Sequence, residues 1–156
     1  MMKTTPLFTS IEDLVLHRPP MLLLESIATW DDSGLEAVAN PQDSYLFADA
    51  NGDVPVWVGI EYMAQAISAF SGLTAKIRGE ALGIGFLLGT RRYTAEVVSF
   101  AAAQKLSVRV RELLKDDTGL VLFDCHIYAG ERLLASAEIK AIQPDDANKV
   151  LAHINQ

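Results

Sequence analysis

The chain has 156 residues, half of them hydrophobic, and a formal net charge of −7. This length allows one hydrophobic core, so we expect a single domain over residues 1–156. The acidic balance argues against a nucleic-acid partner, because nothing would offset phosphate repulsion. We expect no membrane span and no signal peptide, since no apolar run has the required length or place. A single cysteine excludes an internal disulfide and favours a reducing cytoplasm.

The N-terminal third predicts a short helix, two strands and a long loop. Residues 9–16 can open a helix, which the His-Arg-Pro-Pro sequence at 17–20 ends because two prolines cannot continue it. Strands are predicted at 21–30 and 35–39, with a turn between them. Turn-forming residues then fill a loop over 40–55.

A long helix is predicted from about Val56 to Ser71. Asp53 is a plausible cap, and a proline is acceptable in the first turn. The segment is apolar or small on nearly all faces, which is typical of a buried helix. Its polar exceptions form one stripe at helical spacing: Glu61, Gln65 and Ser68.

The second half of the chain predicts four antiparallel strands joined by short turns. These strands are expected at 85–94, 105–113, 121–128 and 133–142. Residues 143–156 form a polar tail, so the folded core covers about 11–142. This order favours an α+β fold in which one antiparallel sheet wraps a single central helix.

Glu61 is the only charged residue between Asp53 and Lys76. An ionised carboxylate is costly to bury among apolar side chains. Such a group has a partner, has a raised pKa, or takes part in chemistry. A structural carboxylate held by an arginine or by backbone groups is the simpler alternative.

No metal or cofactor is predicted. The three histidines and Cys125 are widely scattered and give no metal-ligand spacing. We find no phosphate-binding glycine loop and no serine in a nucleophile turn. His126 and His153 are expected at the surface, and Cys125 is expected in the core.

Three segments resemble the hotdog-fold family of 3-hydroxyacyl-[acyl-carrier-protein] dehydratases of fatty acid biosynthesis. They are similar to family segments that read PHRYPFLLVD, PGVLIIEAMAQ and FAGIDKARF. In this chain they read LHRPPMLLL (16–24), PVWVGIEYMAQ (55–65) and GFLLG followed by RRY (85–93). The resemblance covers roughly residues 11–142 and implies a hotdog fold and a hydro-lyase acting on acyl thioesters.

The chain departs from this family at two positions. The family's second catalytic group is a histidine in a loop before the central helix, and Phe47 stands in that place. The glycine after the helix-start proline is replaced by Val56. A retained acid with a lost loop histidine resembles a divergent subgroup associated with aryl-polyene pathways, whose members are predicted dehydratases.

The resemblance assigns the catalytic carboxylate to Glu61 and an assisting amide to Gln65; alternatively Gln65 serves packing alone. His17 is the histidine nearest a matching motif and is a candidate replacement for the missing one; alternatively its ring supports a turn. Backbone N–H groups of Val56 and Trp57 at the helix start are expected to be free to polarise a thioester carbonyl. The resemblance also implies a substrate contact at Gly89.

The implied partner is an acyl carrier protein, which is acidic and would be attracted by basic residues in the middle of the chain. Alternatively these basic residues form a solvated strand face. Open sheet edges predict a homodimer, or a heterodimer with another hotdog subunit. Three functions stay open: a dehydratase, a non-catalytic subunit of a heterodimeric dehydratase, and an acyl thioesterase.

Overall fold

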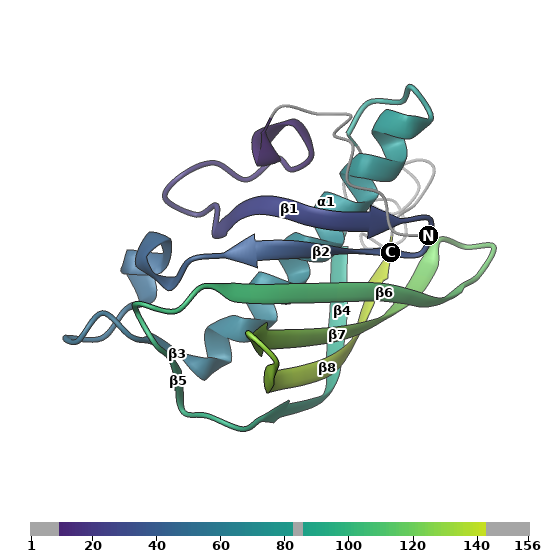
Figure 1. The fold of residues 1–156 in the computed structure, drawn as a ribbon. Helices are drawn as coiled ribbons and strands as arrows, with labels where there is room; N and C mark the ends of the chain where they lie inside the picture. Colours follow the sequence, from purple (N-terminus) through teal and green to yellow (C-terminus); the bar gives the residue numbers. More distant parts are fainter. Residues whose placement is uncertain (1–9, 83–85, 143–156) are drawn as a thin grey trace, which may run out of the picture.

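A curved antiparallel sheet wraps one long helix in the computed structural model, which describes residues 10–82 and 86–142 (Figure 1). The strand order in the sheet is β1-β2-β6-β7-β8-β4, and every neighbouring pair is antiparallel. The structure therefore confirms the predicted α+β hotdog fold.

The large sheet has six strands, as predicted, and α1 lies against its concave face. The strand bounds are β1 (Leu24–Asp31), β2 (Gly34–Ala39), β4 (Phe86–Ala95), β6 (Leu106–Lys115), β7 (Leu120–Ala129) and β8 (Arg132–Ile142). The helix α1 spans Gly59–Ile77. The short elements are the 3-10 turns η1 (Ile11–Asp13), η2 (Pro41–Phe47) and η3 (Val56–Val58), and the two-stranded ribbon β3 (Val54–Pro55) with β5 (Ser99–Phe100).

The core lies between α1 and the inner face of the sheet. Tyr62, Met63 and Ala66 of α1 are fully buried, which confirms the predicted buried helix. Alternate residues of β7, among them Phe123 and Cys125, point at the helix and are also fully buried. The period of two in the strands and the apolar helix therefore produce one continuous core.

The helix begins and ends later than predicted. Residues Val56–Val58 form the 3-10 turn η3, and α1 then continues to Ile77. Gly79, at φ 69°, adopts the left-handed conformation that commonly ends helices. Asp53 is not the helix cap: Pro55 precedes η3 and Val58 precedes α1, while Asp53 Oδ1 accepts a hydrogen bond from the N–H of Ala102 at 2.9 Å.

Two other N-terminal predictions need correction. The helix predicted at 9–16 is only the 3-10 turn η1 within the described residues. The loop predicted at 40–55 contains η2, which begins after the Asn40 side chain caps the N–H of Gln42. The predicted tail at 143–156 lies outside the described residues.

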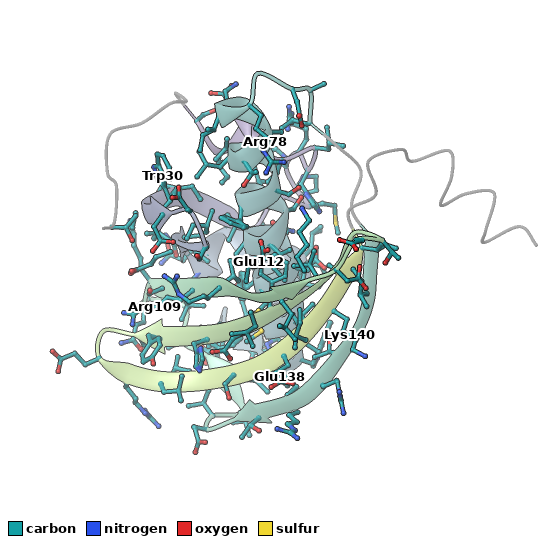
Figure 2. The ribbon with its side chains drawn as sticks, turned by 90° about the vertical axis from the view of Figure 1, so that its right-hand side faces the viewer. Trp30, Arg78, Arg109, Glu112, Glu138 and Lys140 are labelled. Carbon is teal, nitrogen blue, oxygen red and sulfur yellow. The ribbon has the colours of Figure 1, made fainter. Side chains whose placement is uncertain are left out.

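The outer face of the sheet is charged, and three of its basic side chains form ion pairs. Figure 2 shows Arg109, Glu138 and Lys140 along the strands of this face. The ion pairs on this side are Lys105–Glu25 at 2.9 Å, Arg109–Glu36 at 3.7 Å and Arg111–Asp31 at 3.0 Å. These contacts favour the solvated strand face over a free basic patch.

Candidate active site

Glu61 lies in the first turn of α1, and its side chain is 40% exposed in the isolated chain. The sequence predicted a buried carboxylate, but the polar stripe of α1 is not covered by the sheet at this turn. This chain alone therefore leaves the Glu61 carboxylate partly open to solvent.

Gln65, one helical turn later, is fully buried and holds Glu61. Its Nε2 donates to Glu61 Oε1 at 3.0 Å and to the carbonyl of Met21 at 2.8 Å. Its Oε1 accepts the N–H of Leu23 at 2.8 Å. Because Leu23 can only donate and Met21 can only accept here, the amide orientation is unambiguous. Gln65 therefore presents an N–H to the carboxylate.

His17 lies beside the same carboxylate oxygen. Its Nε2 is 3.9 Å from Glu61 Oε1, a distance that permits an ion pair but exceeds a hydrogen bond. The His17 side chain is 34% exposed, and its Nδ1 is buried without a hydrogen-bond partner among the described residues. The structure thus brings together the three polar side chains His17, Glu61 and Gln65.

Phe47, which the sequence resemblance aligns with the family's loop histidine, makes an aromatic contact. Its ring meets that of Trp57 edge to face, with centroids 6.0 Å apart and planes at 86°. The loop before α1 therefore supplies an apolar wall at the helix start. Trp57 itself is 62% exposed.

Only one of the two backbone donors predicted at the helix start is free of a backbone partner within the described residues. The N–H of Val56 is not free, because it donates to the carbonyl of Val98 at 3.1 Å. The Val56 carbonyl accepts a hydrogen bond from the Tyr93 hydroxyl. Since a trans peptide points its N–H opposite to its C=O, the Trp57 N–H is directed away from Tyr93. Of the predicted pair, Trp57 is the remaining donor.

Tyr93 was not singled out by the sequence, although it follows two arginines in a matching motif. A register shift lies between Arg91 and Thr94 of β4, and within it Arg92 has φ 55°. This irregularity aims the Tyr93 side chain at the helix start. Burial raises the pKa of Tyr93 to about 12, which keeps the hydroxyl a neutral donor at ordinary pH.

Gly89 is separate from this group. It lies in β4 opposite Lys140 of β8, and a Cβ built on it would meet no atom within 4 Å. No hydrogen bond or ion pair joins Gly89 to His17 or Glu61 in the described part of the chain. Its substrate contact stays a prediction.

The remaining candidate groups lie outside the site. His126 is on the outer sheet face, 3.8 Å from Asp124, and Cys125 is fully buried, as expected. Burial, with the negative charge of Asp124, raises the pKa of the Cys125 thiol far above its ordinary value. His153 lies beyond the described residues. Within residues 10–82 and 86–142, no three acidic, histidine or cysteine side chains are grouped to hold a metal ion.

Among the described residues, no helix has both the length and the apolar character that crossing a membrane would require.

Comparisons with known proteins identify the family. A comparison with curated protein sequences gives no match. Among solved structures, the dehydratase heterocomplex ApeI:P from Xenorhabdus doucetiae is similar, with 27% identity and a TM-score of 0.86. The match covers 96% of this chain and 99% of that chain.

More distant structures share the fold alone. A mutant of the phenylacetic acid degradation protein PaaI from Thermus thermophilus has 11% identity and a TM-score of 0.58, covering 78% of this chain and 94% of that chain. A probable thioesterase from Bartonella henselae has 13% identity and a TM-score of 0.55, covering 71% of this chain and 90% of that chain.

The family model described as ApeP-like, ApeP dehydratase, matches residues 9–152. The chain belongs to the ApeP-like dehydratase family.

Proposed function

We propose that this chain dehydrates 3-hydroxyacyl thioesters, with Glu61 and His17 as the pair that moves protons. The supporting observation is the short distance between the two groups, with His17 Nε2 3.9 Å from Glu61 Oε1. Gln65 holds the same carboxylate oxygen through its 3.0 Å hydrogen bond. A positioned acid and base of this kind contribute about 10²–10⁴-fold to a proton-transfer reaction.

The reaction needs both members of the pair. One group removes a proton from the carbon next to the thioester carbonyl, and the other protonates the hydroxyl on the following carbon. The carbon–oxygen bond then breaks, water leaves, and an enoyl thioester remains. The negative charge that develops on the thioester oxygen needs a donor. The Trp57 N–H is the candidate, because the Val56 N–H is bonded to Val98.

We extend the proposal to a substrate carried by an acyl carrier protein in the cytoplasm, as part of fatty acid or polyene biosynthesis. The ApeI:P structure, at 27% identity, is a dehydratase composed of two different chains. This supports a second hotdog subunit as the partner of this chain, with a homodimer as the alternative. No cofactor is required, since the reaction consists only of proton transfers and loss of water.

The non-catalytic subunit remains the main alternative, because Phe47 stands where the family has its loop histidine. The test compares three samples on a 3-hydroxyacyl carrier-protein substrate: this chain alone, a hotdog partner alone, and the mixture. Formation of the enoyl thioester is followed by ultraviolet absorbance. Activity that is abolished by Glu61→Gln in this chain supports the proposal. A mixture that is insensitive to both Glu61→Gln and His17→Ala contradicts it.

The thioesterase alternative uses the same carboxylate, because a helix glutamate can also activate water. The same samples are therefore tested for release of free thiol from the acyl thioester. Thiol release without enoyl formation would replace the dehydratase proposal with the thioesterase. The distant thioesterase-like structures do not decide this point, since they show only a common fold.

A further inference from the structure

The position of His17 depends strongly on its backbone, because no hydrogen bond holds its ring among the described residues. Nδ1 has no hydrogen-bond partner among the described residues, and Nε2 is 3.9 Å from its nearest carboxylate oxygen. One-third of the side chain is exposed. The ring direction therefore follows from how the segment that carries His17 is held. We name residues 11–23 the N-terminal strap.

Both ends of the N-terminal strap are attached to α1. At one end, the Leu14 carbonyl lies directly on the helix at Gly72, where a Cβ would come within 1.8 Å of the oxygen. At the other end, Gln65 bonds the carbonyl of Met21 and the N–H of Leu23. The strap thus lies along the helix over the distance between Gly72 and Gln65, about 10 Å for seven residues.

Between these attachments, Arg18 connects the two halves of the strap. Its guanidinium turns back and donates to three carbonyls: Val15 at 2.8 Å, His17 at 2.8 Å and Glu12 at 3.2 Å. Its own carbonyl accepts the N–H groups of Met21 at 2.9 Å and Leu22 at 3.1 Å. The Arg18 side chain therefore holds the residues before Arg18, and the Arg18 carbonyl holds those after it.

The chemistry of this contact suits arginine in particular. The carbonyls at the end of a short helical turn lack intrahelical partners and need donors. A planar guanidinium supplies several N–H groups in a fixed arrangement, and its charge strengthens each hydrogen bond. One side chain can therefore fix the peptide that follows His17 and, at Val15, the turn that precedes it.

We propose that Arg18 is a positioning residue that orients His17 toward Glu61. This inference rests on the proposed role of His17 in the reaction. Arg18 touches no reacting atom, and its effect on turnover passes through the His17 ring. Truncating it to alanine leaves three carbonyls without their donor and frees the peptide next to His17.

The test is a double-mutant cycle in the active assembly, with Arg18→Ala, His17→Ala and the pair. Arg18→Ala is expected to lower kcat about tenfold with KM changed by less than twofold. In the His17→Ala background, Arg18→Ala should change kcat by less than twofold. An equal loss of kcat in both backgrounds would assign Arg18 a general structural role and overturn the inference.

Arg78→Ala is the matched control, because Arg78 is an exposed arginine at the opposite end of α1 (Figure 2). It should leave kcat unchanged. A second readout does not depend on activity: NMR signals of the His17 ring should move in Arg18→Ala and stay in place in Arg78→Ala. Unmoved His17 signals would overturn the inference. If His17→Ala retains full activity, the catalytic role of His17 fails, and the ring signals still decide whether Arg18 orients it.

Discussion

The two oxygens of Glu61 differ in their surroundings. Oε1 accepts the Gln65 amide at 3.0 Å and is the atom closest to His17. Oε2 has no hydrogen bond within the described residues, and the side chain is 40% exposed. Oε1 is thus the oxygen that sets the orientation, and Oε2 is available to a substrate.

Replacing Glu61 by Gln tests the acid–base role with little change in shape. Turnover is expected to fall by about 100-fold or more, because an amide cannot exchange the proton. The free energy of unfolding should change by less than about 1 kcal/mol, since the charge of a partly exposed carboxylate contributes little to stability. Steady-state kinetics and urea unfolding measure the two effects. Full activity in a folded Glu61→Gln protein would refute the role.

His17 and His126 offer a matched pair for a second prediction. Each side chain is about one-third exposed, and each has a ring nitrogen close to a carboxylate, at 3.9 Å from Glu61 and 3.8 Å from Asp124. They differ in place, since His126 lies on the outer sheet face. His17→Ala is expected to lower kcat about 100-fold, and His126→Ala should leave it unchanged. Equal effects of the two substitutions on kcat would contradict a specific role for His17.

At the scale of elements, regular periodicity was predictable and local turns were not. The alternation in β7 and the apolar character of α1 follow from their sequences, and both elements are present. The ribbon of β3 with β5 and the packing of η2 on α1 depend on contacts between distant residues. The buried hydrogen bond between Ser44 and Tyr62, at 2.6 Å, holds η2 on the helix across 18 residues of sequence.

The candidate site was predictable where a residue type decides the chemistry. Glu61 and Gln65 are four residues apart on a helix, so their contact follows from spacing. The contact of His17 with Glu61 joins distant parts of the sequence and depends on the strap, for which the sequence gives no periodic signal. The loss of the Val56 donor depends on Val98, which lies next to the β3–β5 ribbon.

Replacing Gly72 by Ala has two effects of opposite sign on the stability of the protein. Ala is a better helix former than Gly by about 1 kcal/mol. However, a Cβ at this position would lie 1.8 Å from the Leu14 carbonyl, which is backbone and cannot turn away. Overpacking of this kind costs about 1–3 kcal/mol, so Gly72→Ala should destabilise the protein. Urea unfolding measures this, and Ser71→Ala on the same helix is the control. A gain in stability would show that the strap moves freely.

Asp31 makes the stability of the β1–β2 edge depend on pH. Burial tends to raise its pKa, but hydrogen bonds from Arg111 and from the N–H groups of Ser33 and Gly34 outweigh burial and lower it below 3.8. A lowered folded-state pKa contributes stability above the unfolded value, and this is lost as pH falls through the folded value.

Asp31→Asn is therefore expected to lose about 1 kcal/mol of unfolding free energy at pH 7. The difference from wild type should shrink steadily below pH 3.8 and vanish once both forms are neutral. Unfolding in urea at a series of pH values measures it. A difference that is constant down to acid pH would remove the carboxylate as its cause.

At the scale of the whole molecule, two features point to a second chain over the site. The strand β4 lies at one edge of the sheet and pairs only with β8 within the described residues. Large apolar side chains are exposed in the N-terminal strap and in the turn before α1: Leu16 is 61% exposed, Met21 47% and Trp57 62%. Open edges and exposed apolar groups both favour association.

We therefore expect Leu16→Glu and Met21→Glu to weaken assembly at least about tenfold, which corresponds to about 1.4 kcal/mol. The control is Leu114→Glu, which changes a residue that is 68% exposed near the β6–β7 hairpin, away from the strap (Figure 1). Sedimentation over a range of concentrations measures assembly, with this chain alone and with a hotdog partner. The control should assemble like wild type. Equal weakening by all three substitutions would place the interface elsewhere. A wild-type chain that stays monomeric with and without the partner would show that no such interface forms.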